Sequence, residues 1–284
     1  MTDDMRIKLN DTASLVMSWA APLYTEGIVG AFFNQLDLSR GHNLLARCDA
    51  VCPWYSEVIR NRKHFIRHLI ERELRSSDTP CQVVIPAAGM SPLSLELLVD
   101  NPERIAQIIE VDIAGMKEKH ALYGNTASRL SDRVSCVTLD ITSQGFSCET
   151  LRSEAAYNAE ISTIVLFEGI SYYIAEEHLR RAMNTFQSER RCNRIVLEYM
   201  LPCELVKEAR RAIPRGVFEA IGTYAELAHV QCYSPSHVEQ LFESAHGEAM
   251  AHYYLHDMEQ IRTGERRWFV EKGDGWVGCT IGAI

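Results

Sequence analysis

The chain has 284 residues, of which 46% are hydrophobic and 24% are charged, and its formal net charge is −9. This composition is typical of a globular protein, and the length suffices for one α/β domain with an elaboration or for two small domains. The acidic balance argues against nucleic acid and anionic membrane as partners, and no apolar run approaches the roughly 18 residues of a membrane span. The nine cysteines form no paired pattern and the N-terminus is polar, so we expect a soluble cytoplasmic protein. Its oligomeric state is not predicted.

The first part of the chain has the apolar spacing of helices. The stretches "ASLVMSWAAPLY" and "EVIRNRKHFIRHLIERELR" both show this spacing, and the second ends at "SSDTP". Residues 12–76 are therefore predicted to be helical throughout. We expect residues 1–76 to form an N-terminal helical cap.

Strands alternate with helices from residue 81 onwards. Five stretches have the apolar character of buried strands: "QVVIPA", "IAQIIEVDI", "RVSCVTLDI", "ISTIVLFEG" and "RIVLEYML". Alternating units of this kind predict a doubly wound, mostly parallel sheet covered by helices, within a Rossmann-like domain over residues 77–284. The helical stretch "CELVKEARRA" begins a predicted lid-like insertion at about 203–232.

The last part of the chain has a different pattern. "SPSHVEQLFES" is predicted to be a helix opened by Ser and Pro. "AMAHYYL" and "GWVGCTIGAI" are predicted strands, and "HDMEQIRTGERR" is expected to be a polar link between them. Their pairing would be antiparallel at one end of the sheet.

Small and acidic residues stand where the first four strands end. In open parallel sheets, ligands bind beyond the carboxyl ends of the strands. A glycine at such an end lets a ligand approach the backbone, and acids there suit a ligand with hydroxyls, amines or positive charge. The candidate residues are Ala87, Ala88, Gly89, Asp112, Asp140, Ile141, Glu168 and Gly169.

These residue types discriminate between cofactors. The turn reads A-A-G-M-S-P instead of GxGxxG, which disfavours a nicotinamide dinucleotide, and acids would receive a pyrophosphate badly. S-adenosylmethionine (SAM) has no phosphate and carries a sulfonium and an ammonium group, so the acids suit it better. Each residue also has a structural interpretation, since Gly89 could simply end a strand, and Asp112 and Asp140 could cap helices. Glu168 is harder to explain in that way, because a carboxylate after the apolar run "ISTIVLF" needs a partner.

Several motifs in this order resemble one family. "CQVVIPAAGMSPLSLEL", "IIEVDIAGMKEKH" and "LFEGISYYI", with "NDTASLVMSWAAPLYTEGI" and "IRNRKHFIRHLIERELR" upstream, resemble the leucine carboxyl methyltransferase family of class I SAM-dependent enzymes. The resemblance covers roughly residues 10–200. It implies a class I methyltransferase fold with SAM as the cofactor.

The resemblance also implies a role for each candidate. It assigns the SAM carboxylate to Arg62, and it alone selects that residue among Arg60, Arg62, Lys63 and Arg67, each of which could otherwise be a solvated charge. It implies that the backbone of Ala87, Ala88 and Gly89 contacts the methionine part of SAM and that Asp112 binds the ribose. It also implies that Asp140 and Ile141 contact the adenine. Glu168, with Gly169 beside it, would bind the amino group. Two positions depart from the family pattern. Met17 stands where a lysine is usual and Ala87 where a second glycine is usual, and the missing lysine argues against a carboxylate as methyl acceptor.

Two tyrosines are the candidates nearest to the reaction. Tyr172 and Tyr173 follow Glu168, where their rings could wall a sulfonium by cation–π contact. A metal is not expected, because His252 and His256 fall in a predicted strand that sets them too far apart.

Three functions remain open at this point. The first is methyl transfer to a small molecule, in specialised metabolism. The second is cyclisation of SAM to azetidine-2-carboxylate and methylthioadenosine, in which the α-amino group attacks Cγ of the same molecule. The third is SAM binding without turnover.

Overall fold

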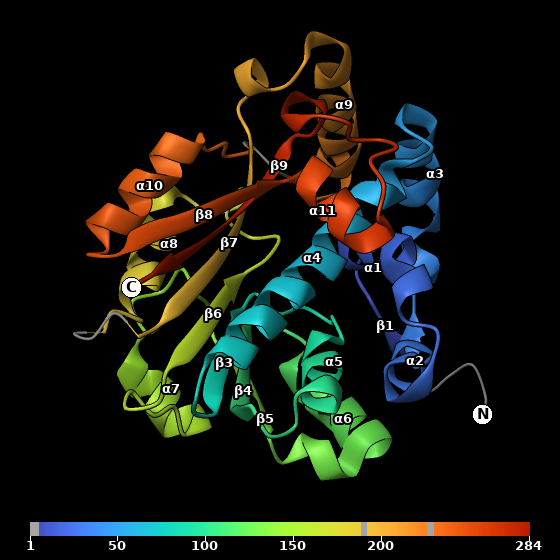
Figure 1. Cartoon of the computed structure of the whole chain (residues 1–284). Helices are drawn as coiled ribbons and strands as arrows, with labels where there is room; N and C mark the ends of the chain where they lie inside the picture. Colours follow the sequence, from blue (N-terminus) through green and yellow to red (C-terminus); the bar gives the residue numbers. More distant parts are fainter. Residues whose placement is uncertain (1–5, 189–191, 226–229) are drawn as a thin grey trace.

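The structure is a computed structural model that describes residues 6–188, 192–225 and 230–284. Its centre is a seven-stranded sheet with the order β5-β4-β3-β6-β7-β9-β8 (Figure 1). The strands are β3 (Cys81–Pro86), β4 (Ile105–Asp112), β5 (Val134–Thr138), β6 (Thr163–Phe167), β7 (Arg194–Met200), β8 (Glu248–Tyr254) and β9 (Val277–Ala283).

Most neighbouring strands of this sheet are parallel. Strands β3 to β7 pair in parallel, whereas β9 is antiparallel to both β7 and β8. The predicted mostly parallel sheet with antiparallel pairing at one end is therefore confirmed. The residues of β3 and β6 are all buried, as expected of parallel strands that are covered on both faces.

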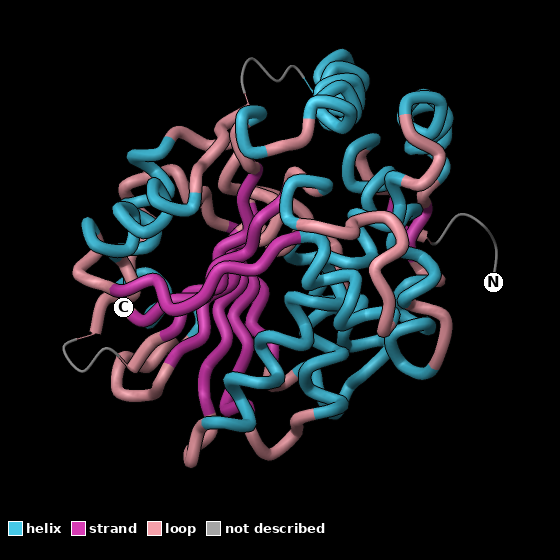
Figure 2. Tube along the Cα trace, turned by 45° about the horizontal axis from the view of Figure 1, so that its top comes forward, coloured by secondary structure: helices cyan, strands magenta, loops and turns pink. Residues whose placement is uncertain are grey.

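Helices lie on both sides of the sheet (Figure 2). Five of them connect or follow its strands: α5 (Leu93–Asp100), α6 (Met116–Ser131), α7 (Cys148–Ala155), α8 (Glu176–Asn184) and α10 (Pro235–Ser244). Two begin at a serine whose hydroxyl accepts a backbone N–H, Ser147 for α7 and Ser234 for α10.

The N-terminal part is helical, with one short exception. Its helices are α1 (Asp11–Ala20), η2 (Ala21–Leu23), α2 (Gly27–Phe33), η3 (Ser39–Gly41), α3 (His42–Val51) and α4 (Tyr55–Ser76). The expectation that 12–76 is helical throughout is wrong at β2 (Leu36–Asp37), which pairs in parallel with β1 (Ile7–Lys8). That short pair fixes the chain before α1 against the chain after α2.

The predicted insertion contains η4 (Cys203–Leu205) and α9 (Glu208–Ala225). Helix α9 packs against α3, so closely that a Cβ on Gly216 would lie 2.9 Å from Cγ1 of Val51. The N-terminal helices and the inserted helix therefore meet, as Figure 1 shows beside the upper end of the sheet. Residues 226–229 of the expected insertion and 1–5 of the expected cap lie outside the described residues.

The expected polar link after β8 is wrong, because it contains the helix α11 (Leu255–Thr263) and the short η5 (Lys272–Asp274). The Asp257 carboxylate accepts the Tyr254 N–H at 3.0 Å at the start of α11, and Gly264, with φ +78°, ends the helix. Leu255 and Met258 are buried, and the helix packs on α4. These start and stop signals are present in the sequence, but the many charges between them resemble a solvated loop.

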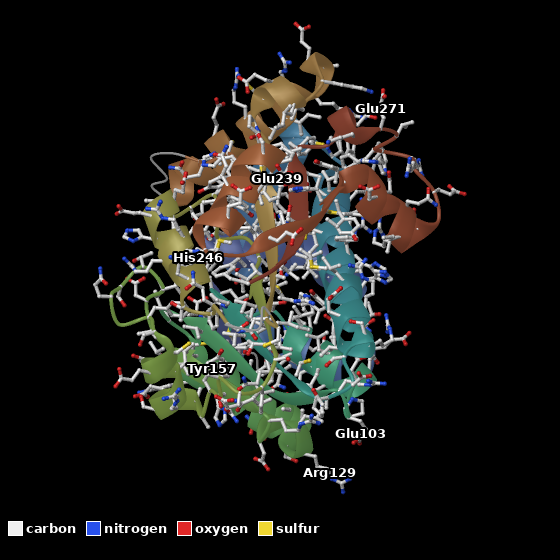
Figure 3. All side chains as sticks on the ribbon, turned by 60° about the vertical axis from the view of Figure 1, so that its left-hand side comes forward. Glu103, Arg129, Tyr157, Glu239, His246 and Glu271 are labelled. Atoms are coloured by element: carbon white, nitrogen blue, oxygen red, sulfur yellow. The ribbon has the colours of Figure 1, made fainter. Side chains whose placement is uncertain are left out.

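The amino ends and the carboxyl ends of the parallel strands lie toward opposite ends of the molecule. Glu103 and Arg129, which precede β4 and β5, lie at one end, and Glu271, beside η5, lies toward the other (Figure 3). Leu201, just after β7, donates its N–H to the Trp276 carbonyl at 2.8 Å, which places η5 near the carboxyl edge. Within the described residues, no helix combines the length and apolar character that crossing a membrane requires.

The turn after β3 has an unusual backbone. Both Ala87 (φ +57°) and Gly89 (φ +52°) are in the left-handed region. Glycine adopts this conformation freely, but an alanine there places Cβ too close to the following carbonyl. The backbone at Ala87 is therefore strained.

Because of this strain, we do not expect a glycine at position 87 to have the destabilising effect that glycine usually has. Ala87→Gly should leave the free energy of unfolding unchanged or raise it by up to about 1 kcal/mol, because it removes the left-handed penalty. The matched control is Ala121→Gly, at an exposed position inside α6, which should lower it by about 1 kcal/mol. Urea denaturation measures both changes. An equal loss in the two variants would show that the Ala87 backbone is relaxed.

Candidate active site

The site lies at the carboxyl edge of the sheet, where the chain reverses its direction of winding. From β3 the chain proceeds to β4 and β5 on one side, and then β6 and β7 are added on the other side of β3. Neighbouring connections thus leave β3 and β6 in opposite directions and open a crevice between them, the usual ligand site of such sheets. The residues that follow these two strands, Gly89 and Glu168, are both sequence-predicted candidates.

The Gly89 turn and Asp112 are joined directly. The Gly89 N–H donates to Oδ2 of Asp112 at 2.8 Å, and the Ile113 N–H donates to Oδ1 at 2.7 Å. A carboxylate has about four acceptor positions, so Asp112 retains capacity for two ribose hydroxyls. A Cβ on Gly89 would meet nothing within 4 Å, so the turn has an open side along which a ligand can lie on the backbone.

Asp140 and Ile141 lie beside this turn at the end of β5. The Leu139 N–H donates to the Asp112 carbonyl at 2.9 Å and so ties the two strand ends together. Oδ1 of Asp140 accepts both the N–H and the hydroxyl of Thr142 at 2.7 Å, and these hydrogen bonds lower the pKa of the carboxyl. Asp140 is exposed and ionised at neutral pH, whereas Ile141 is buried.

Glu168 is paired with Lys63 of α4. Lys63 Nζ donates to Oε1 of Glu168 at 2.9 Å and lies 3.5 Å from the hydroxyl of Ser91. Burial alone would raise the pKa of Glu168, but the charges of Lys63 and Arg62 outweigh it and hold the pKa below its ordinary value. The prediction that this carboxylate needs a partner is confirmed. The identity of the partner was missed, because nothing in the local pattern distinguishes Lys63 from the other bases of α4.

Arg62 is paired with Glu198 of β7. Its Nη2 donates to Oε2 of Glu198 at 2.6 Å, and the same oxygen accepts the Gly169 N–H at 2.9 Å. Burial raises the pKa of Glu198, an effect that Arg62 only partly offsets. Glu198 was also missed by sequence reasoning, although a glutamate inside the apolar run "RIVLEYM" is a signal that could have found it. Arg62 and Lys63 are both buried, so neither is a solvated surface charge.

Two buried polar atoms of this pair have no hydrogen-bond partner among the described residues. They are Nε of Arg62 and Oε1 of Glu198. Buried polar groups are normally satisfied, and unsatisfied ones often mark a site that a ligand or water completes. The atoms lie at the edge where Gly169 follows β6.

An aromatic cluster adjoins the same edge. The rings of Tyr172 and Tyr173 are 4.5 Å apart, and Phe218 of α9 lies 5.8 Å from the first and 6.3 Å from the second. A Cβ on Gly169 would lie 3.7 Å from Tyr172 Oη, so this cluster lies directly beside the residue that follows Glu168. Tyr172 is buried, whereas Tyr173 keeps 38% of its surface exposed.

A cavity of about 500 Å³ lies beyond this cluster, between the end of β7 and α9. Its walls are mostly apolar, with two arginines and a glutamate from α9. They are formed by Met200, Leu201, Cys203, Val206, Arg211, Pro214, Arg215, Phe218, Glu219, Gly222, Val230, Cys232 and Trp276. The sequence predicted an insertion at about 203–232 but did not assign these residues to a cavity.

Metal binding has no geometric support in the part of the chain that the structure describes, where no three metal-ligating side chains gather. His252 is on β8 with Nδ1 2.6 Å from the Thr280 hydroxyl, and His256 is in α11, not in a strand as expected.

Comparison with known proteins gives one family, and the solved structures that match include two that span almost the whole chain. The family model for leucine carboxyl methyltransferase matches residues 34–187, more than half of the chain. A crystal structure from Thermobifida fusca YX, described as a candidate methyltransferase, has a TM-score of 0.62 at 12% identity, over 99% of this chain and 96% of that one. A DUF574 family protein from Streptomyces avermitilis has a TM-score of 0.67 at 9% identity, over 96% and 97%. No curated protein matches.

The residues at the strand ends fit SAM. The open side of the Gly89 turn provides a cradle, the carboxylates suit ribose and ammonium groups, and the two cations of α4 beside Glu168 and Gly169 suit a carboxylate. Together with the family match, this arrangement leads to one conclusion: the chain belongs to the leucine carboxyl methyltransferase family and is a SAM-dependent methyltransferase.

Proposed function

We propose that the protein transfers a methyl group from SAM to a small, largely apolar molecule bound in the cavity beneath α9. The observation that carries this proposal is the position of the 500 Å³ cavity, which shares Phe218 with the aromatic cluster beside Gly169. Pockets for small molecules are typically of this size and mostly apolar. A molecule in this cavity would be separated from the cofactor edge by little more than the rings of the cluster.

The proposed cofactor contacts follow the strand ends. Asp112 accepts the ribose hydroxyls, while Asp140 and Ile141 adjoin the adenine. The backbone of Ala87, Ala88 and Gly89 supports the methionine part. The amino-acid end lies between Glu168 with Gly169 and the two cations of α4, Arg62 and Lys63.

The chemistry demands little from the side chains. SAM supplies an activated methyl group on a sulfonium, and its displacement needs mainly proximity, alignment and the exclusion of water. Tyr172 and Tyr173 present aromatic rings that attract a cation, so we propose that they orient the sulfonium toward the cavity.

We also propose that the N-terminal cap and the α9 insertion act together as the cover of the site. They pack against one another through α3 and α9, and α4 carries both cations of the amino-acid end. A cover of this kind excludes water from the sulfonium.

The aromatic cluster supports a second candidate, cyclisation of SAM. Tyr172, Tyr173 and Phe218 could hold the sulfonium without an acceptor, and the products would then be azetidine-2-carboxylate and methylthioadenosine.

Product analysis tests the proposal. The protein is incubated with SAM alone and with SAM plus a protein-free small-molecule extract of host cells, and the nucleosides are identified by mass spectrometry. We expect S-adenosylhomocysteine only with the extract, because methyl transfer needs an acceptor. In Gly222→Leu, which enlarges a residue of α9 that lines the cavity, its formation should fall about tenfold or more with cofactor affinity unchanged. Methylthioadenosine from SAM alone would support cyclisation instead, and neither product would contradict both.

Asp112 gives an independent test of the cofactor position. Asp112→Ala should weaken S-adenosylhomocysteine binding by about 2–4 kcal/mol, because it removes charge-assisted hydrogen bonds to the ribose. The control is Asp132→Ala, an exposed carboxylate that follows α6 at the opposite edge of the sheet, and it should have no effect. Titration calorimetry measures both, and unchanged affinity in Asp112→Ala would remove the ribose assignment.

A further inference from the structure

We propose that the cavity beneath α9 binds an organic acid, and that Arg211 and Arg215 hold the carboxylate of this acid at the end away from the cofactor. The carboxylate is the group by which the acceptor is recognised, and the methyl group is transferred to a different atom of the same molecule. This inference rests on the proposed function and names the chemical class of the acceptor.

The charged residues of the cavity wall have a positive balance. Arg211, Arg215 and Glu219 of α9 line a cavity that is otherwise mostly apolar, so the wall carries one net positive charge. The whole chain has a net charge of −9, so a positive wall does not follow from composition. A ligand with one carboxylate balances this charge. An ammonium group would add to it, and a phosphate dianion would exceed it.

The two arginines present free donors on one side of α9. They are four residues apart, so they lie on the same face of the helix. Nε of Arg211 donates to the Val206 carbonyl at 2.8 Å, which holds the guanidinium against the wall. Its Nη groups and the guanidinium of Arg215 have no partner among the described residues. The planar fork of a guanidinium matches the two oxygens of a carboxylate.

The neighbouring Arg210 shows what a structural arginine of α9 looks like. Its Nη2 donates to the Trp268 carbonyl at 3.0 Å, and its guanidinium carbon lies 4.9 Å from the centre of the Trp54 ring. These contacts fix α9 to the segment before η5 and account for the residue. Arg211 and Arg215 line the cavity instead.

The guanidinium groups and the aromatic cluster lie at different heights along α9. Phe218, whose ring is 5.8 Å from that of Tyr172, comes three residues after Arg215 and seven after Arg211. A helix rises about 1.5 Å per residue, so these positions are about 5 and about 10 Å from Phe218 along the axis. Arg215 is exposed and Tyr172 is buried. A carboxylate on the arginines is therefore separated by an apolar body from the atom that receives the methyl group.

A further donor lies in the buried part of the wall. Nε1 of the buried Trp276 has no hydrogen-bond partner of good geometry among the described residues. The indole stacks on Tyr55 at 5.6 Å. Burial raises the pKa of Tyr55, and the nearby Trp276 and Arg62 partly offset this, so Tyr55 lies between the cavity and the cofactor edge. An unpaired donor in this position suits an oxygen of the ligand and not an ammonium group.

Fractionation of the small-molecule extract tests the class of acceptor. An anion-exchange resin separates the extract at neutral pH into a retained acidic fraction and an unretained fraction, and each is incubated with SAM and the protein. We expect S-adenosylhomocysteine with the retained fraction only, and also after that fraction has been treated with phosphatase, because a carboxylate survives this treatment. The methylated product should itself be retained by the resin, because its carboxylate is not esterified.

The outcomes separate this inference from the proposed function. Three results would overturn the carboxylate assignment while methyl transfer stands: activity with the unretained fraction, loss of activity after phosphatase, or a product that the resin no longer retains. Absence of S-adenosylhomocysteine with every fraction would instead contradict the proposed function.

Matched probes test the cavity without turnover. 4-Phenylbutyrate and 4-phenylbutanamide have the same apolar body and differ in charge, and their affinities are measured by ligand-observed NMR. We expect the acid to bind about tenfold more tightly than the amide, because only the acid forms charge-assisted hydrogen bonds with the arginines. Equal affinities, or no detectable binding of the acid, would overturn the inference.

Three variants assign the effect to residues. Arg215→Met should weaken 4-phenylbutyrate roughly 5- to 20-fold and leave the amide within about threefold. Glu219→Gln should strengthen the acid roughly two- to threefold, because it removes a negative charge from the wall. Arg180→Met, at an exposed position of α8, is the matched control and should change neither affinity. Equal losses of the acid in Arg215→Met and Arg180→Met would show that only the overall charge of the protein attracts it, which contradicts a carboxylate site on α9.

Discussion

Two buried ion pairs that start from adjacent residues of α4 organise this protein. Arg62 reaches Glu198 on β7, and Lys63 reaches Glu168 after β6, so one turn of a cap helix is fixed to two neighbouring strands of the sheet. Burial of four charged groups is costly unless each is paired with good geometry. The position of α4 against the ends of β6 and β7 and the charge balance of the site depend on this pairing.

The same pairing explains how a site without obvious acid–base groups can be selective. In the proposed function, the charged groups of these pairs hold the zwitterionic amino-acid end of the cofactor. The aromatic cluster then separates this charged end from a mostly apolar cavity. In the proposed function, the polar cofactor and the largely apolar acceptor thus have separate compartments that meet at Phe218.

The features that could be predicted from the sequence are those that depend on short stretches of the chain. Buried strands, the Gly89 turn and the acids at the strand ends depend on residues close together in the chain, and the structure has them at the expected edge of the sheet. Helix α11 was mistaken for a loop because its charges obscure the apolar face of Leu255 and Met258. The partners of the acids could not be predicted, since Lys63 and Glu168 are 105 residues apart and Arg62 and Glu198 are 136 apart. The cavity depends on the packing of α9 against the β7 end, which no local pattern encodes.

A crystal structure with S-adenosylhomocysteine bound tests the central claim most directly. The account predicts the ribose hydroxyls on Asp112, the ammonium on Glu168 and the carboxylate beside the two cations of α4, Arg62 and Lys63. A ligand whose ribose lies away from Asp112, or a ligand bound away from the ends of β3 and β6, would contradict it.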